Sequence, residues 1–135
     1  MHKTFRQGNL GISKVISKIL EKGYIPLTPF GENNRYDLVY EKNSKFIKVQ
    51  VKSVSLKKNN TLRVKLHSVN FNQHGSHRNH YGLNEIDEMW VYNPDKDVVF
   101  HFSLSEFIGK HGVTFRFDKT KNNQSKNVHY VSSYL

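Results

Sequence analysis

A strict alternation of apolar and polar residues between Phe46 and Ser53 is the feature that most constrains how this chain can fold. Three apolar and three polar side chains take turns along it: Ile47, Val49 and Val51 against Lys48, Gln50 and Lys52. Because successive side chains of a strand point to opposite faces of a sheet, this period of two predicts a strand. We expect one face of the strand to be buried and the other to remain polar.

The segment before it predicts a partner strand. Tyr36–Glu41 is expected to run antiparallel to Phe46–Ser53 through a turn at Lys42–Lys45. If Asn43 and Ser44 are the central turn residues, apolar side chains pair across one face of the hairpin: Tyr40 with Ile47, Leu38 with Val49, and Tyr36 with Val51.

The same register defines the polar face of this hairpin. Asp37 is expected opposite Gln50, and Arg35 opposite Lys52, with directly opposed Cβ atoms about 5 Å apart. A slip of one residue would move the apolar side chains to this face, whereas a slip of two would preserve both faces. The face of each residue is therefore better determined than its exact partner.

Asp37, Gln50 and Lys52 are thus expected to converge on one patch. Carboxylate and amide oxygens suit a hard cation such as Mg²⁺, which can polarise a phosphodiester and lower the pKa of a bound water. Lys52 would orient that water or neutralise the charge that develops on phosphorus. The alternative is an ordinary Asp–Lys pair on a solvated strand face, which the spacing alone slightly favours.

The charge balance favours a polyanionic partner. Lys and Arg number 21 against 11 Asp and Glu, a formal net charge of +10, so we expect nucleic acid first and a membrane surface second. The basic residues are spread among Asn, Ser, His and Tyr, which is typical of a folded surface rather than a basic tail. By charge and loop position, the candidate phosphate contacts are Arg35, Lys57, Lys58, Arg78, Lys119, Lys121 and Lys126.

The remaining composition limits the class of protein. A chain of 135 residues is expected to form one domain, residues 1–135. Cysteine is absent, which excludes disulfides and cysteine-bound zinc. No apolar run approaches the ~20 residues of a membrane span, and "MHKTFRQGN" lacks the apolar stretch of a signal peptide. We expect an intracellular protein of the cytoplasm or nucleoid that is neither secreted nor membrane-bound.

Hydrophobic periodicity predicts a helix from Asn9 to Lys22. Asn9 is the expected N-cap and Gly23 the expected C′ residue. Its apolar stripe is formed by Ile12, Val15, Ile16, Ile19 and Leu20. With several strands following, the pattern predicts an α/β chain of the α+β type, in which this helix covers a small mixed sheet.

Further elements are expected downstream. Residues 68–84 carry no clear period and predict a loop. Ser103–Ile108 predicts a short helix, with Ser103 and Glu106 at capping-box spacing. The expected strands are Thr61–His67, Met89–Tyr92, Val98–Phe102 and Val113–Phe117.

Two other polar clusters are candidate metal-binding or catalytic sites. "HGSHRNH" spaces His74, His77 and His80 by three residues, which would allow zinc binding or an HNH nuclease. A polar loop on DNA is the favoured interpretation, because no fourth ligand is evident. "NEIDEM" holds Glu85, Asp87 and Glu88, which we interpret as turn residues before a strand rather than as an acid–base pair.

Asp37, Gln50 and Lys52, in this order, resemble the signature of the PD-(D/E)XK nuclease superfamily. "YDLVY" is followed by "KVQVKS", with Gln50 in the (D/E) position. That glutamine is similar to a branch of group I intron homing endonucleases. Other segments that look like this branch span nearly the whole chain: "QGNLG", "KGYIPLTPFGENNRYDLVY", "NEIDEMWVYNP" and "FRFDKTKNNQSKNVHY".

The resemblance implies a restriction-endonuclease-like core, a mixed sheet with the N-terminal helix packed on it. It also implies a Mg²⁺-dependent endonuclease that cuts double-stranded DNA at a long site, with Mn²⁺ able to substitute. Asp37 and Gln50 would be the metal ligands, helped by the Val51 carbonyl, and Lys52 would be the catalytic lysine. Relatives of this kind assemble as homodimers or homotetramers.

One position departs from the family pattern. Many members carry a glutamate on the first helix, and by the spacing after "QGN" that position is Ile12 here. Glu32 and Glu41 are nearby candidates for a second carboxylate, although exposed loop or turn positions are favoured for both.

Three other functions stay open. The first is a Holliday-junction resolvase or restriction-like nuclease with the same core. The second is a DNA-binding protein with a degenerate active site, motivated by Ile12. The third is an RNA-binding domain, which ranks last because the glycine-aromatic signature of a common RNA-binding strand is missing.

Overall fold

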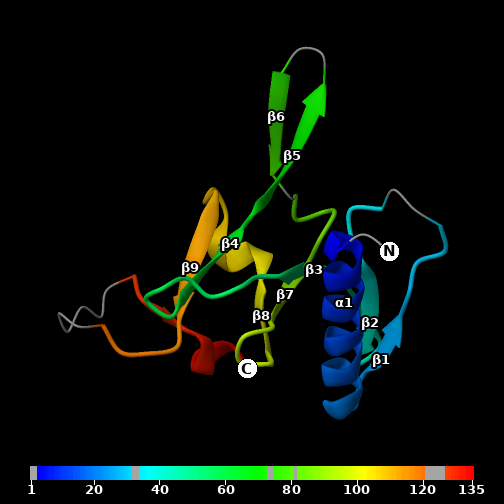
Figure 1. Cartoon of the computed structure of the whole chain (residues 1–135). Helices are drawn as coiled ribbons and strands as arrows, with labels where there is room; N and C mark the ends of the chain where they lie inside the picture. Colours follow the sequence, from blue (N-terminus) through cyan, green and yellow to red (C-terminus); the bar gives the residue numbers. More distant parts are fainter. Residues whose placement is uncertain (1–2, 32–33, 73–74, 81, 121–126) are drawn as a thin grey trace.

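The computed structural model describes residues 3–31, 34–72, 75–80, 82–120 and 127–135 (Figure 1). Of these, residues 3–5, 67–72 and 75–80 are described by their backbone. The main sheet has the strand order β1-β2-β3-β7-β8. Strands β3 and β7 are parallel and the other neighbours antiparallel, so the predicted mixed sheet is present. Its members are β1 (Ile25–Leu27), β2 (Leu38–Lys42), β3 (Lys45–Ser53), β7 (Glu88–Asn93) and β8 (Val98–Ser103).

Two smaller sheets complete the fold. One has the strand order β10-β9-β4, and the other is the hairpin β5-β6. Two short 3₁₀ helices, η1 (Leu104–Phe107) and η2 (Val131–Tyr134), lie near the C-terminus. The strands are β4 (Thr61–Lys65), β5 (His67–Asn72), β6 (Gly75–His80), β9 (Gly112–Arg116) and β10 (His129–Tyr130).

The predicted helix is α1 (Lys3–Glu21), and it packs on β3 and β7. Val15 and Ile19 are fully buried, but Leu20 is 58% exposed, so the predicted stripe is wrong at its last member. The helix starts six residues before Asn9, which is therefore not its N-cap. Residues 3–8 carry no regular apolar stripe, and periodicity detects only the part of a helix that packs.

The C-terminus of α1 confirms the prediction for Gly23. Gly23 has a φ of 86°, a conformation that glycine adopts without a Cβ penalty. Its N–H donates to the Leu20 carbonyl at 2.9 Å, and the Tyr24 N–H donates to the Ile19 carbonyl at 3.1 Å. This pair of bonds is a Schellman motif, which satisfies the last carbonyls of the helix.

Each face of the main sheet is covered differently. Helix α1 covers one face, where Val49, Val51 and Trp90 join Val15 and Ile19 in a helix-side core. On the opposite face β7 and β8 pack against the β10-β9-β4 sheet in a second, larger core. That second core includes Met89, Val91, Phe100, Phe102, Leu62, Val64, Val113 and Phe115.

Several element predictions need correction. Residues 68–84, predicted as a loop, contain most of the β5-β6 hairpin. Strand β4 ends at Lys65, and His67 begins β5 instead of ending the previous strand. Ser103 precedes η1 but makes no side-chain capping bond. Glu106 instead accepts a hydrogen bond from the Tyr134 hydroxyl at 2.7 Å, which removes it from the predicted capping box.

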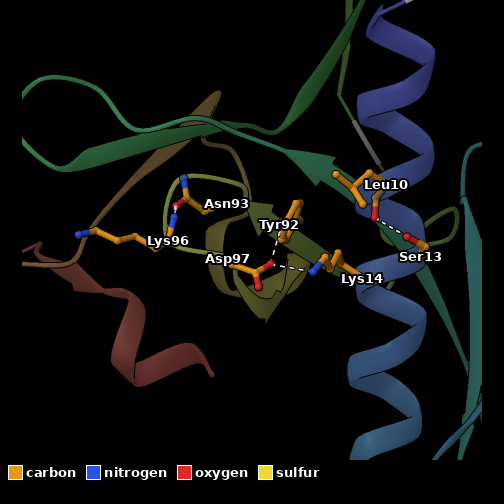
Figure 2. Close-up of polar contacts among 7 residues, drawn as sticks. All are labelled: Leu10, Ser13, Lys14, Tyr92, Asn93, Lys96 and Asp97. Carbon is orange, nitrogen blue, oxygen red and sulfur yellow. Dashed lines mark hydrogen bonds and ion pairs between the residues drawn. The ribbon is translucent and has the colours of Figure 1, made fainter. Parts of the chain in front are cut away.

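Polar contacts join α1 to the β7–β8 turn (Figure 2), and a further one joins the chain after β3 to Asn93. Lys14 Nζ lies 2.9 Å from Asp97 Oδ1, which also accepts from the Tyr92 hydroxyl at 2.8 Å. Asn93 is fully buried, and its Nδ2 donates to the Val54 carbonyl at 2.8 Å. The Asn93 contact thus holds the chain two residues beyond Lys52.

Candidate active site

Asp37 lies just before β2 and is anchored to β3. The ladder between the two strands ends at Leu38 and Val49, in the predicted register with Asn43 and Ser44 in the turn. Beyond it, the Asp37 N–H donates to the Val49 carbonyl at 2.8 Å. Asp37 Oδ2 accepts from the Val51 N–H, also at 2.8 Å.

This arrangement corrects part of the predicted register. The expected strand pairs of Asp37 with Gln50 and of Tyr36 with Val51 are not in the ladder. Instead the carboxylate of Asp37 occupies the position where a backbone carbonyl would accept the Val51 N–H. A sequence pattern cannot reveal this substitution, because Asp37 keeps the same parity as Val39 and Glu41.

Gln50 and Lys52 lie on the polar face of β3, as predicted. Val49 and Val51 face α1 in the helix-side core, so the residues between them face the other way. There Gln50 is beside Met89, and Lys52 is beside Val91, on the parallel neighbour β7. Met89 and Val91 are fully buried beneath the second sheet, whereas Gln50 and Lys52 are only half-buried. The polar patch thus begins where the covering sheet ends.

The positive charge of Lys52 acts on the carboxylate of Asp37. Burial raises the pKa of Asp37 above its ordinary value, and two effects oppose that rise: the Val51 N–H and the positive charge of Lys52. A carboxylate that is costly to ionise in this position is stabilised by additional positive charge. Asp37 is therefore a half-buried carboxylate on which the charge of Lys52 acts, beside the strand that carries Gln50.

The other candidate carboxylates that the structure describes lie far from Asp37 along the chain or bind other groups. Glu41 is four residues along β2 from Asp37, about 13 Å in an extended strand. Glu85 pairs with Arg35, with 2.9 Å between Oε2 and Nε. Asp87 accepts the Lys48 N–H at 2.9 Å. Glu88 accepts from the Tyr40 hydroxyl at 2.6 Å and from Trp90 Nε1 at 3.0 Å.

Ile12 packs against the helix-side core, partly buried. Within the described ranges, no group of three His, Asp or Glu residues is arranged to hold a metal ion. Glu32 and His74 lie outside the described residues, and for His77 and His80 only the backbone is described. Asp37 and Gln50 therefore stay the predicted oxygen donors of this site.

The predicted phosphate contacts are scattered. Lys57, Lys58 and Lys119 are exposed on loops, and Arg35 forms the ion pair with Glu85. Arg78 lies in β6, where only the backbone is described, and Lys121 and Lys126 lie outside the described residues. None of these positions was tested by the structure as a DNA contact.

Sequence reasoning missed two exposed basic residues on β4. Leu62 and Val64 are fully buried in the second core, and Arg63 and Lys65, which alternate with them, are exposed on the outer face. The guanidinium of Arg63 lies against Gly112 on β9, where a Cβ would come within 2.9 Å of it. The alternation in "TLRVK" was the signal that could have identified this basic face.

In the part of the chain that the structure describes, no helix is long and apolar enough to cross a membrane.

Comparison with known proteins places this geometry in a family. The sequence pattern of the PD-(D/E)XK endonuclease family matches residues 2–135. The fold is similar to the structure of a bacterial homing endonuclease, I-Ssp6803I. That likeness has a TM-score of 0.79 and 24% identity, and it covers 98% of this chain and 88% of that chain. It confirms the predicted restriction-endonuclease-like architecture. No curated protein sequence matches the chain. Because the family pattern extends over essentially the full length and the fold agrees with it, the chain belongs to the PD-(D/E)XK endonucleases.

Proposed function

We propose that this protein is a site-specific, metal-dependent endonuclease of the homing type that hydrolyses phosphodiester bonds in double-stranded DNA. One observation carries the proposal: Asp37 is fixed on the Val51 N–H at 2.8 Å, and the charge of Lys52 acts on it, at the open end of a polar strand face. Family membership and the net charge of +10 support a DNA substrate.

The donor set fits a hard divalent cation, for which we propose Mg²⁺, with Mn²⁺ as a substitute. Asp37 and Gln50 would hold it, because carboxylate and amide oxygens are the ligands that such ions prefer. A bound divalent cation would supply Lewis-acid chemistry, polarising the phosphodiester and activating a water. Burial already raises the pKa of Asp37, so a cation beside it would favour the ionised carboxylate.

Lys52 has a separate task in this proposal. Attack of a water oxygen on phosphorus breaks the bond to the 3′ oxygen, leaving a 5′-phosphate and a 3′-hydroxyl. Negative charge grows on the phosphoryl oxygens during attack, and the Lys52 ammonium would stabilise it. The contacts of Val54 and Asn93 just beyond Lys52 hold that part of the strand in place.

The proposal is tested by cleavage of supercoiled and linear duplex libraries with Mg²⁺ and then Mn²⁺. Lys52→Ala is expected to lower the cleavage rate by about 100- to 1,000-fold, the usual cost of losing one charge-stabilising donor. Lys45→Ala is the matched control, because it removes the same charge from an exposed position at the other end of β3. Equal cutting by wild type and Lys52→Ala would refute the assigned site.

A second function is favoured by the position of Ile12. Its packing against the helix-side core leaves Asp37 as the carboxylate seen at the site, which is what a DNA-binding protein that has lost catalysis would show. Salt-sensitive binding without cutting, in Mg²⁺ or Mn²⁺, would select this function. Preferential cutting of four-way junctions over linear duplex would instead select a resolvase.

Two copies of the site in one assembly can face the two strands of a duplex at once. We therefore propose that the active form is a homodimer or homotetramer. Light scattering of the protein with and without a cleavable duplex would measure this, and a monomer that cuts both strands in one encounter would contradict it.

A further inference from the structure

The β5-β6 hairpin is the part of the fold whose presence the proposed active site does not explain. Its strands pair with each other in a two-stranded sheet of their own, from His67 opposite His80 to Asn72 opposite Gly75. Figure 1 shows this hairpin projecting away from both larger sheets and from α1. An isolated two-stranded ribbon is only marginally stable in water, so its retention points to a role other than supporting the core.

The composition of this ribbon suits contact with nucleic acid. Its twelve described residues include three Asn, three His and Arg78, against only two large apolar residues, Val69 and Phe71. Asparagine and arginine are the side chains that most often read adenine and guanine through paired hydrogen bonds. Directly paired positions of the two strands share a face of the ribbon, and successive positions of a strand alternate between its two faces. One face of this ribbon therefore has a polar residue or glycine at every position. Those positions are Ser68, Asn70, Asn72, Gly75, His77 and Asn79.

Charge along the chain connects the ribbon to the active site. No Asp or Glu occurs between Glu41 and Glu85, although nine Lys and Arg residues do. This acid-free segment contains β3 with Gln50 and Lys52, then β4, then the whole hairpin. None of these strands therefore carries a carboxylate that would repel a polyanion.

Two basic residues stand at the base of the ribbon. Arg63 and Lys65 are exposed on β4, which leads directly into β5. Neither forms an ion pair with a carboxylate among the described residues. Such side chains suit phosphate contacts, which fix the register of a protein on DNA without reading sequence.

We infer that the β5-β6 hairpin is an arm that reads base edges in the DNA major groove, with Arg63 and Lys65 anchoring its base on phosphates. Six-residue strands span about 20 Å, enough to traverse a groove about 12 Å wide that admits a two-stranded ribbon. The inference rests on the proposed function only in taking duplex DNA as the ligand. It assigns sequence recognition to the arm and hydrolysis to β3.

The test is a binding selection from randomised duplex DNA, without divalent cation, followed by sequencing of the bound fraction. One variant, Asn70→Ala with His77→Ala, changes two directly paired positions in the middle of the ribbon. A second variant replaces residues 68–79 by Asn-Gly, which closes a two-residue turn between the paired positions His67 and His80. Arg63→Ala with Lys65→Ala tests the phosphate contacts at the base of the ribbon, and Lys52→Ala is the control for catalysis.

Wild type and Lys52→Ala are expected to select the same motif. Both hairpin variants should lose preference at particular base pairs, by at least about 5-fold at each, while binding random duplex with similar affinity. Arg63→Ala with Lys65→Ala should weaken binding to every duplex equally and reduce its salt dependence. Circular dichroism verifies that each variant is folded. If the paired alanine variant fails to fold, the base preference of the shortened variant alone tests the inference.

Two results would overturn the inference. Either wild type selects no motif, or the shortened variant selects the full motif with undiminished preference. Cutting of the selected duplex by wild type and Lys52→Ala is measured separately. Absence of cutting would refute the proposed hydrolysis, and a motif lost with the hairpin would still assign recognition to the arm.

Discussion

The two halves of one face of the main sheet differ in how deeply their side chains are buried. Where β7 and β8 form the face, Met89, Val91 and Phe100 are buried under the β10-β9-β4 sheet. Where β3 forms it, Gln50 and Lys52 are only half-buried, although they lie next to Met89 and Val91 of β7. The change occurs across a single pair of parallel strands.

The difference separates stability from chemistry. The covered half removes large apolar side chains from water, which is the dominant favourable term in folding. The open half keeps Gln50 and Lys52 half-exposed, and burial raises the pKa of Asp37, so ionising its carboxylate is less favourable there than in water. Substitutions in the two halves should therefore change different properties of the protein.

The largest stability effect is expected from Phe115→Ala in the covered half. Phe115 is fully buried, and its ring contacts those of Phe100, Phe102 and Phe107. Removing it should cost about 3–5 kcal/mol of unfolding free energy, or roughly 10–20 °C in Tm. Gln50→Ala should change the unfolding free energy by less than about 0.5 kcal/mol. Urea denaturation measures both.

A large loss of stability in Gln50→Ala would break this comparison. It would mean that the polar face of β3 supports the fold rather than the chemistry. The m-value checks that both variants unfold from the same native state, because it scales with the surface exposed on unfolding.

A smaller effect, of opposite sign, is expected from Asp37→Asn. Burial raises the folded-state pKa of Asp37 above its ordinary value of 3.8, so the folded protein holds this proton more tightly than the unfolded chain. The stability contributed by protonated Asp37 is fully present below the unfolded-state pKa and is lost as pH rises through the folded-state pKa. Asparagine does not titrate and can still accept the Val51 N–H, so the Tm of the variant should rise relative to wild type across that window.

Thermal unfolding with a metal chelator, from acid to neutral pH, measures this difference. Adding Mg²⁺ should then reverse the order, because a cation that binds the folded state stabilises wild type but not the variant. If Asp37→Asn becomes less stable relative to wild type as pH rises, the carboxylate is stabilised rather than strained by its surroundings. If Mg²⁺ leaves the Tm of wild type unchanged, Asp37 does not hold the metal.

The β2-β3 hairpin was predictable because its apolar pattern determines its register. A one-residue slip would have exposed Leu38 and Tyr40, and the observed ladder pairs Leu38 with Val49 and Tyr40 with Ile47 as predicted. The C-terminus of α1 was predictable for a similar reason, since Gly23 adopts a positive φ at low cost. Both are local choices with one favourable answer.

The errors arose where tertiary context decides. The carboxylate of Asp37 replaces a backbone acceptor for Val51, and nothing in strand periodicity marks that exchange. The β5-β6 hairpin pairs only with itself, and its sequence carries no clear apolar period, so residues 68–84 were predicted as a loop. Gln50 and Lys52 were placed on the correct face, but the end of the covering sheet beside them could not be foreseen from sequence.

The smallest effect is expected at the β7–β8 turn, where Asp97 contacts Lys14 of α1 (Figure 2). Hydrogen bonds from Lys14 and Tyr92 lower the pKa of Asp97. Their contribution to stability is present above the unfolded-state pKa and is lost as pH falls through the lower folded-state value. Asp97 has a φ of 52°, which asparagine tolerates, so Asp97→Asn removes the charge without straining the turn. Its Tm should be slightly below that of wild type at neutral pH, and the gap should close in acid and in high salt.

Exposed Lys96, in the same turn, provides the control, since Lys96→Ala should show no such pH dependence. A gap that persists in acid would mean that the turn geometry, not the charge, was disturbed. Neither Lys14 nor Asp97 belongs to the open half of the sheet face, so DNA cutting by Asp97→Asn should equal that of wild type. Lost cutting at unchanged stability would extend the site across the sheet, because it would show that the Lys14 contact positions α1, and through it β3, for the reaction.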